Sequence, residues 1–254
     1  RNDALYQAYC AILREELVRW RRWLHTHPEL GMDLPGTAAY VRTQLEEMGY
    51  TVQSLCGTGL AALLEGSKPG KTLLLRADMD ALPIQEESGE PFSSQNPGVC
   101  HACGHDTHTA MLLGAAKLLM AHREEVCGRV KLVFQPGEEG AGGAQAMVKA
   151  GVLESPHVDA AMALHQVVTR HNVPSGTLCY TPGGTMASCD VFRITVRGKG
   201  CHGAAPELGV NPIHLLCSIY QAIQTIEFCE KKRQRPMALS VGQIQAGAAG
   251  NVIP

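Results

Sequence analysis

Three short apolar runs in this chain of 254 residues each end in side chains of the kind that bind metals or move protons. The runs are Lys71–Ala77, Val130–Phe134 and Val158–Leu164. A nearly continuous apolar run is typical of a strand that a parallel sheet buries on both faces. The carboxyl ends of parallel strands meet at one edge of the sheet, where ligands bind in open α/β folds. The sequence therefore predicts an α/β fold with a mostly parallel sheet flanked by helices.

The residues that follow these runs point to one shared site. Asp78 and Asp80 follow the first run, Glu138 and Glu139 the second, and His165 the third. Each acidic pair, taken by itself, also fits a polar turn. Three such ends in one sheet favour a common site instead. Adjacent residues that leave a strand point in opposite directions, so one glutamate could hold a metal while the other acts as a base.

The densest group of metal-binding residue types lies in Val99–Ala116, just before an apolar helix. It contains Cys100, His101, Cys103, His105, Asp106 and His108. Thiolate, imidazole and carboxylate are the side chains that bind transition metals. His105 and His108 are three residues apart and share a face near the start of the helix, and we expect His101 and His108 to support the ligands rather than bind. A closed zinc site made of Cys100, Cys103, His105 and His108 is an alternative, but it gives the strand-end acids no role.

The remaining pattern predicts further elements and two domains. We expect helices at 3–24, 36–48, 106–122, 144–150 and 212–229, and further strands at 51–55, 60–65, 176–180, 190–197 and 237–244. His25 and His27, at the end of the first helix, are interpreted as packing or capping residues. Pro182, Gly183 and Gly184 indicate a linker. The alternating segment 190–197 is typical of a strand with one solvated face, so a separate α+β domain is expected after the linker. The predicted domains are 1–183 and 184–254.

Composition excludes several classes of partner. The formal net charge is −2, from 22 basic and 24 acidic residues, and no charge block suggests nucleic acid or an anionic membrane. No apolar run approaches the roughly 18 residues needed to span a bilayer. No secretory signal is visible at the N-terminus, so a cytoplasmic location is expected. The chain has 10 cysteines, and their placement beside histidines favours metal chemistry over a disulfide framework.

Six motifs, in order, resemble the M20 metallopeptidase family and specifically its amidohydrolase branch. They are RADMDALP, CHACGHDTHTAMLLGAA, FQPGEEGAGGA, ALH, GKGCHGAAP and GNVIP. The branch includes hippurate hydrolases, N-acyl-amino-acid amidohydrolases and auxin-conjugate hydrolases. The resemblance implies a catalytic domain with an inserted lid or dimerisation domain. It also implies two divalent metal ions per subunit, zinc or manganese, with nickel or cobalt as alternatives.

The resemblance also implies roles for individual residues. By motif position the metal ligands are Cys103, His105, Glu139 and His165, the general base is Glu138, Asp80 orients a ligand, His202 reaches the active site of a partner subunit, and Asn251 contacts the substrate. Asp78 stands where other branches place a metal-binding histidine and is not assigned as a ligand.

The implied activity is hydrolysis of the amide bond of N-acyl amino acids, with hippurate-like or N-acetyl substrates. Two metals would activate the water, and Glu138 would take its proton and pass it to the leaving amine. The small-molecule substrate would be the partner, together with a second subunit bound through the lid in a homodimer. A dipeptidase or aminopeptidase of the same fold is the alternative, as is an inactive fragment of such an enzyme.

The sequence also departs from the family pattern. It starts with Arg and stops after GNVIP, so we expect it to be trimmed at both ends and the lid to be unfinished. The family has a further histidine ligand near its C-terminus that this sequence lacks, which would leave one metal under-coordinated. Cys201 replaces a glycine, Glu207 stands where relatives often carry histidine, and the residues after His165 lack the usual proline. These three changes bear on substrate preference more than on chemistry.

Overall fold

The computed structural model describes residues 3–167, 174, 176–184, 187–230 and 237–254. The chain divides into two compact units, residues 1–172 and residues 173–254. The division into domains at 183/184, and the assignment of the second domain as a lid, stay predictions.

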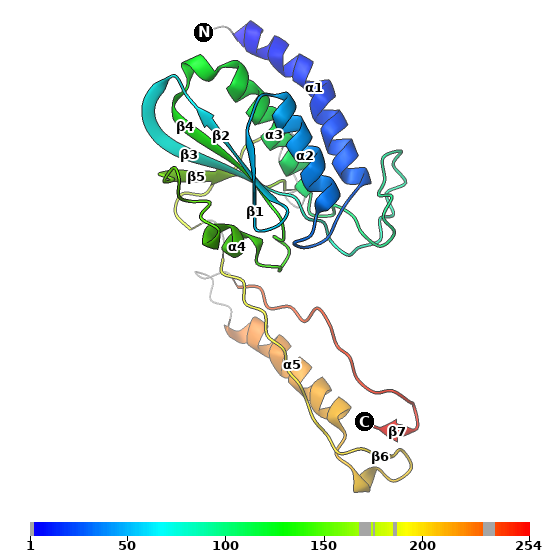
Figure 1. Ribbon diagram of the computed structural model, residues 1–254. Coiled ribbons are helices and arrows are strands. Elements are labelled where there is room, and N and C mark those ends of the chain that lie inside the picture. The colour runs from blue at the N-terminus through cyan, green and yellow to red at the C-terminus, as the bar shows by residue number, and fades with distance from the viewer. Residues whose placement is uncertain (1–2, 168–173, 175, 185–186, 231–236) are drawn as a thin grey trace. The chain divides into compact units, whose positions relative to one another are not determined.

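The first unit is an α/β unit built on a five-stranded sheet (Figure 1). Its strands are β1 (Val52–Leu55), β2 (Gly59–Glu65), β3 (Lys68–Asp78), β4 (Cys127–Gln135) and β5 (Ala160–Ala163). They lie side by side in the order β1-β2-β4-β3-β5. β3 pairs in parallel with both β4 and β5, whereas β2 is antiparallel to both of its neighbours. Only β2 therefore runs against the common direction, which confirms the prediction of a mostly parallel sheet flanked by helices.

Helices cover both faces of this sheet. They are α1 (Asp3–Thr26), α2 (Pro35–Glu47), α3 (His105–Ala121) and α4 (Gly143–Lys149), with a single 3₁₀ turn at Arg123–Glu125. Figure 1 shows α1, α2 and α3 on one face and α4 on the other. The larger core lies under the three helices and includes Trp20, Leu24, Val41, Leu45, Leu113, Leu132 and Phe134. A smaller core of Leu74, Val133, Met147 and Val152 lies on the side of α4.

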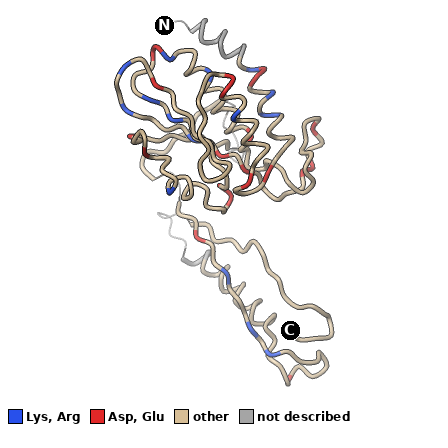
Figure 2. The backbone as a smooth tube through the Cα atoms, in the orientation of Figure 1, with Lys and Arg blue, Asp and Glu red and all other residues tan. Residues whose placement is uncertain are grey.

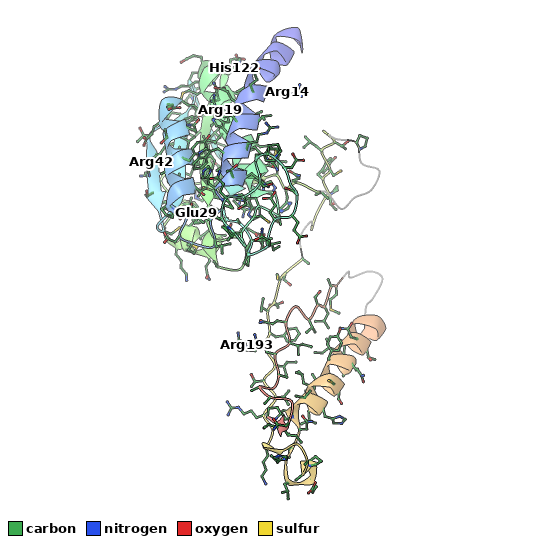
Figure 3. The ribbon with its side chains drawn as sticks, turned by 90° about the vertical axis from the view of Figure 1, so that its right-hand side faces the viewer. Arg14, Arg19, Glu29, Arg42, His122 and Arg193 are labelled. Atoms are coloured by element: carbon green, nitrogen blue, oxygen red, sulfur yellow. The ribbon has the colours of Figure 1, made fainter. Side chains whose placement is uncertain are left out.

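The entry into α2 shows how local chemistry sets an element boundary. Pro35 is the first residue of the helix, a position where its missing N–H costs nothing. The carboxylate of Glu29 accepts hydrogen bonds from the backbone N–H groups of Gly36 and Thr37, at 3.1 and 2.7 Å. Glu29 therefore caps the helix from the preceding loop, where Figure 3 labels it. A carboxylate at this end also complements the helix dipole.

The strand register places three strand ends at one edge. Asp78 at the end of β3 is level with Gln135 at the end of β4, and Arg76 is level with Ala163 at the end of β5. The predicted convergence of strand ends is therefore confirmed. The expectation that the last strand is buried is wrong, because all four residues of β5 are exposed. β5 is the last strand of the sheet among the described residues, so no further described strand lies along its outer edge.

The second unit contains α5 (Pro212–Glu230), a 3₁₀ turn (Pro206–Leu208), and β6 (Cys201–His202) paired antiparallel with β7 (Val252–Ile253). The helix expected at 212–229 is confirmed. The strands expected at 176–180, 190–197 and 237–244 are wrong, because no ladder includes these described residues. An alternating pattern predicts which side chains share a face, but a strand also needs a hydrogen-bonded neighbour. The alternation remains without a covering layer, and Val191 is 95% exposed.

Charges of the two signs are mixed rather than segregated in the first unit. Basic and acidic positions are interspersed along the backbone of the first unit (Figure 2). This distribution agrees with a net charge of −2 and with the absence of a charge block in the sequence. Among the described helices, none is long and apolar enough to cross a membrane.

Candidate metal centre

Donor atoms from four segments converge at the edge where β3, β4 and β5 end. Three groups of side chains each place their ligand atoms within 4.8 Å of one another. The groups are Cys103–His105–His165, His105–Glu138–Glu139 and Asp78–His105–His108. The Sγ atom of Cys103 lies 3.5 Å from Nε2 of His165, and Nε2 of His105 lies 3.8 Å from a carboxylate oxygen of Glu139. The structure thus brings together the five residues that the sequence assigned as ligands and base.

His105 belongs to all three groups. The turn at the preceding residue sets its backbone position, and a backbone carbonyl orients its ring. Gly104 precedes it with φ of +85°, a conformation that glycine adopts without steric cost. This turn starts α3 at His105 itself, one residue earlier than the sequence predicted. Nδ1 of His105 donates to the backbone carbonyl of Asp80 at 2.8 Å. In the neutral ring Nε2 therefore carries the lone pair, and it is buried without a hydrogen-bond partner.

The lack of a partner for this nitrogen shows whether the surrounding residues suit a metal ion. A buried polar atom without a partner costs about 1–3 kcal/mol, so folded proteins rarely keep one without a reason. A divalent cation at this point would satisfy Nε2 of His105. The neighbouring thiol, imidazole and carboxylates form a mixed donor set that suits zinc and is compatible with manganese. The residues present therefore fit a metal centre.

Asp80 positions the two glutamates. One carboxylate oxygen accepts the backbone N–H of Glu138 at 2.9 Å, and the other accepts that of Glu139 at 3.0 Å. Burial alone would raise the pKa of Asp80, but hydrogen bonding by His105 and by these two amides outweighs it and lowers the pKa. Asp80 thus stays ionised and joins the end of β3 to the loop after β4. Its predicted role in orienting a ligand stays a prediction.

Cys103 lies in a strongly negative environment. Burial and the negative charge of Glu139 raise the pKa of its thiol to about 11. Metal binding requires the thiolate, so a bound cation must offset this repulsion. The same proximity that disfavours the free thiolate thus favours a cation among these groups.

Asp78 and His108 form the third candidate group with His105, and both are engaged by neighbouring protein groups. One oxygen of Asp78 accepts from Nδ1 of His108 at 2.6 Å, and the other pairs with the guanidinium of Arg76 at 2.9 Å. Burial opposes ionisation of Asp78, but His108 and Arg76 outweigh it and hold its pKa at about 2. Nε2 of His108 accepts the backbone N–H of Gln166 at 2.8 Å. Both ring nitrogens of His108 are therefore engaged, and its supporting role stays a prediction.

The closed zinc site of four thiol and imidazole ligands is not formed. Among the described residues, no candidate donor group contains Cys100, and none joins His108 to Cys103. His101 is also outside these groups. It is buried, neither of its ring nitrogens has a hydrogen-bond partner, and burial lowers its pKa to about 4.

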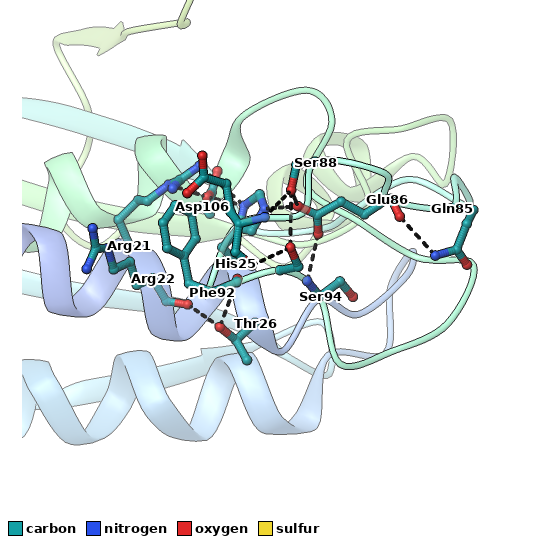
Figure 4. A network of polar contacts seen from close by, with 12 residues as sticks. Arg21, Arg22, His25, Thr26, Gln85, Glu86, Ser88, Phe92, Ser94 and Asp106 are labelled. Carbon is teal, nitrogen blue, oxygen red and sulfur yellow. Dashed lines mark hydrogen bonds and ion pairs between the residues drawn. The ribbon is translucent and has the colours of Figure 1, made fainter.

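The sequence interpretation missed some contributors near the site. His25 does more than pack at a helix end, because it contacts two carboxylates (Figure 4). No role near the site was predicted for Arg76 or Gln166. Both sit beside residues that the sequence singled out, Arg76 next to the RADMD acids and Gln166 directly after His165. Their position next to a motif is the sequence signal that could have identified them.

His202 and Asn251 lie in the second unit, close to each other. The N–H of Gly203 donates to the backbone oxygen of Asn251 at 2.8 Å, beside the β6–β7 ladder. Nδ1 of His202 accepts the N–H of Ala204 at 3.1 Å, so a neutral His202 carries its proton on Nε2. Their roles toward the metal centre stay predictions.

The fold and the donor set define an α/β unit that gathers metal-binding residues at the carboxyl ends of its strands. Residues 74–249 match the model of peptidase family M20/M25/M40. The chain belongs to this family, which confirms the resemblance read from its motifs.

The chain is also similar to individual named proteins. The chain is 41% identical over 244 residues to the N-acyl-L-amino acid amidohydrolase of Geobacillus stearothermophilus, covering 95% of this chain and 65% of that protein. It is 40% identical over 246 residues to the hippurate hydrolase of Campylobacter jejuni and to thermostable carboxypeptidase 2 of Saccharolobus solfataricus. These alignments cover 95% of this chain and 62% and 61% of the relatives, so the chain spans about three fifths of their length.

The chain is also similar to solved structures, one of which is a member of the M20 family. A dinuclear metal-binding peptidase of the M20 family from Bacillus subtilis is 41% identical, with a TM-score of 0.60, over 62% of this chain and 44% of that one. A proposed aminohydrolase from methicillin-resistant Staphylococcus aureus is 31% identical, with a TM-score of 0.73. That match covers 100% of this chain and 66% of the other.

Proposed function

We propose that this chain forms the metal-binding part of a hydrolase that cleaves the amide bond of N-acyl amino acids. One observation carries the proposal. A thiol, two imidazoles and two carboxylates, from Cys103, His105, His165, Glu138 and Glu139, meet at one sheet edge, and the buried Nε2 of His105 faces them without a partner. A site with this mixture of donors, open to solvent at Glu138 and Glu139, is typical of catalytic rather than structural metal centres.

Four side chains would hold the metal ions: Cys103, His105, Glu139 and His165. Zinc or manganese fits this set, with nickel or cobalt as alternatives. Two divalent cations would supply Lewis-acid polarisation and acidify a water molecule. Asp80 holds the backbone of both glutamates, so the ligand Glu139 and its neighbour are fixed together.

Glu138 is the proposed general base. It lies next to Glu139 in the same turn and belongs to one donor group with it and His105. A carboxylate here would accept a proton from water and deliver it to the leaving nitrogen, which is the proton traffic that amide hydrolysis needs. The amide nitrogen otherwise leaves as a strongly basic anion.

His202 and Asn251 are proposed to act on the substrate. The Nε2–H of His202 is a donor suited to the negative charge that develops on the amide oxygen, and the amide of Asn251 is suited to a substrate carboxylate. We propose that His202 acts in the site of a partner subunit, in a homodimer formed through residues 184–254. Exposed apolar side chains in that range, such as Val191 and Phe192, support a further contact surface.

The names of the relatives support the proposed substrate class. Relatives at about 40% identity are named for N-acyl amino acids and for hippurate, which is itself an N-acyl amino acid. Another is named a carboxypeptidase, so cleavage of peptides at a free carboxylate is the second candidate. Both substrate classes share an amide bond next to an amino acid carboxylate.

A substrate panel tests the proposal. The full-length protein that contains this sequence is loaded with Zn²⁺ or Mn²⁺ and assayed with hippurate, N-acetyl amino acids and free dipeptides. We expect the N-acyl amino acids to be cleaved, activity to disappear with a chelator, and activity to return with the metal. Preferential cleavage of free dipeptides would replace this function with a peptidase. No metal-dependent hydrolysis of any of them would overturn it.

A further inference from the structure

A chain of hydrogen bonds and one ion pair crosses the three strand ends behind the candidate metal ligands. Nε of Arg76 on β3 donates to the side-chain oxygen of Gln135 at the end of β4, at 3.0 Å. The same guanidinium pairs with Asp78 at 2.9 Å, and Asp78 accepts from His108 at 2.6 Å. His108 in turn accepts the backbone N–H of Gln166 at 2.8 Å. The chain therefore runs from β4, through β3 and α3, to the residue after His165.

The partners of His108 fix both its protonation and its orientation. Nε2 must present a lone pair because the backbone N–H of Gln166 donates to it, so the proton sits on Nδ1 and points at Asp78. Asp78 is itself fixed by Arg76 and is about 1% exposed. The ring of His108 is 2% exposed, so water does not compete for these bonds. A buried group with both ends satisfied has one orientation.

The ring of His108 also touches His165 directly. The two ring centroids are 4.5 Å apart with an interplanar angle of 66°, an edge-on contact. His165 itself is exposed and lies at the end of an exposed edge strand. Nδ1 of His165 faces the backbone oxygen of Gln166 at 2.6 Å, so its ring is oriented by the same residue whose N–H His108 accepts. With little packing around His165, these contacts set the place of its Nε2 beside Cys103.

We propose that His108 is a positioning residue that holds the His165 ligand against Cys103 and His105. It acts through the backbone of Gln166 and through ring contact, and it does not bind the metal itself. This inference rests on the proposed metal centre. It adds that the affinity and geometry of that centre depend on an imidazole that donates at one nitrogen and accepts at the other.

Two variants separate the hydrogen bonds of His108 from its shape. His108→Phe keeps a flat ring against His165 but loses both the donor and the acceptor. His108→Gln keeps an amide N–H and an amide oxygen, at a spacing close to that of the two ring nitrogens. The matched control is His101→Phe, because His101 is another buried imidazole in the same segment, and neither of its nitrogens has a hydrogen-bond partner.

Co²⁺ binding to the full-length protein provides the measurement. A thiolate-to-cobalt charge-transfer band reports the bond to Cys103, and the visible bands report the coordination geometry. We expect His108→Phe to weaken Co²⁺ binding about 10–100-fold and to change the visible bands, the effect typical of losing a group that orients a ligand. His108→Gln should recover part of the affinity, and His101→Phe should bind as the unmodified protein does.

The outcomes distinguish this inference from the proposed function. Equal Co²⁺ affinity and identical bands in all three variants would overturn the role of His108 while leaving the metal centre intact. A missing thiolate band in the unmodified protein would overturn the centre itself and the inference with it. If His108→Phe fails to fold, His108→Gln and ¹⁵N spectra of histidine-labelled protein decide. An Nδ1-protonated histidine that vanishes in His108→Gln supports the proposal, and an Nε2-protonated His108 overturns it.

Discussion

Nδ1 of His25 lies 2.8 Å from a carboxylate oxygen of Asp106, although the two residues are 81 positions apart in the sequence. Asp106 directly follows the candidate ligand His105, so this contact ties the end of α1 to the start of α3. Nε2 of His25 lies 3.1 Å from Glu86, which brings the loop after β3 into the same network (Figure 4). One imidazole therefore joins three segments around the candidate metal centre.

Replacing His25 should destabilise the first unit. In His25→Gln the side chain can no longer carry a charge between the carboxylates of Asp106 and Glu86. Arg21 still pairs with Asp106 at 2.8 Å, so the expected loss is about 1–3 kcal/mol in the free energy of unfolding measured with urea. The control is His157→Gln, which removes an exposed histidine–glutamate pair on the same unit. A control loss as large as that of His25→Gln would show that burial of the pair is irrelevant.

The stabilisation by His25 should depend on pH. The hydrogen bond to Asp106 is the largest cause that raises the pKa of His25, and burial only partly opposes it. A raised folded pKa means that the contribution is fully present below the unfolded pKa of about 6.5 and is lost as pH rises through the folded pKa. The other groups facing His25 keep their charge state there, because Asp106 and Glu86 have lowered pKa values, His101 is neutral and Arg21 is always charged.

The stability difference between the unmodified protein and His25→Gln should therefore be largest near pH 6 and shrink toward pH 9. Urea titrations at several pH values measure it. A difference that grows with rising pH would contradict the assigned charge on His25.

The strand ends were predictable from sequence because two simple patterns coincide there. Each apolar run is followed at once by acids or histidine, and a parallel register brings those positions level. The support given by Asp80 was not predictable in the same way. Its carboxylate binds backbone amides 58 and 59 positions away, and backbone amides leave no residue-type signal. The same holds for His108 and the amide of Gln166.

In the second unit, the sequence pattern predicted strands that the structure does not form. The segment 190–197 alternates apolar and polar residues, yet it forms no ladder among the described residues. Alternation records the face that a chain is able to bury, whereas pairing depends on which other segment lies beside it. The helix α5 was predictable because its hydrogen bonds are internal to the segment.

Replacing Cys103 should remove bound metal. In Cys103→Ser the sulfur that lies 3.5 Å from His165 is lost, and a serine hydroxyl is a poor ligand for zinc. We expect elemental analysis to show a loss of roughly one metal equivalent, or a rise in its dissociation constant, relative to the unmodified protein. Cys127→Ser is the control, because Cys127 is exposed at the start of β4 and belongs to no candidate donor group. Unchanged metal content in Cys103→Ser would exclude Cys103 as a ligand.

Asp80→Ala should weaken metal binding without removing any ligand. The N–H groups of Glu138 and Glu139 lose their acceptor, so the turn that carries both acids loses its fixed position. Loss of such support typically costs about 10–100-fold in metal affinity or activity, and isothermal titration with Zn²⁺ measures it. Asp159→Ala is matched, because the carboxylate of Asp159 also accepts a backbone N–H, that of Thr72 at 2.8 Å. Equal losses in both variants would indicate a general loss of stability instead.

The same substitution at the two adjacent glutamates should affect metal content differently. Glu138→Gln removes the proposed base but no ligand, so metal content should stay intact while kcat for N-acyl amino acid hydrolysis falls by about 10²–10⁴. Glu139→Gln removes a carboxylate that lies 3.8 Å from His105, so metal content should fall and activity with it. Adding excess Zn²⁺ or Mn²⁺ should therefore restore part of the activity of Glu139→Gln and none of that of Glu138→Gln. The reverse pattern of rescue would exchange the two roles, because one carboxylate would then hold the metal from the position assigned to the base.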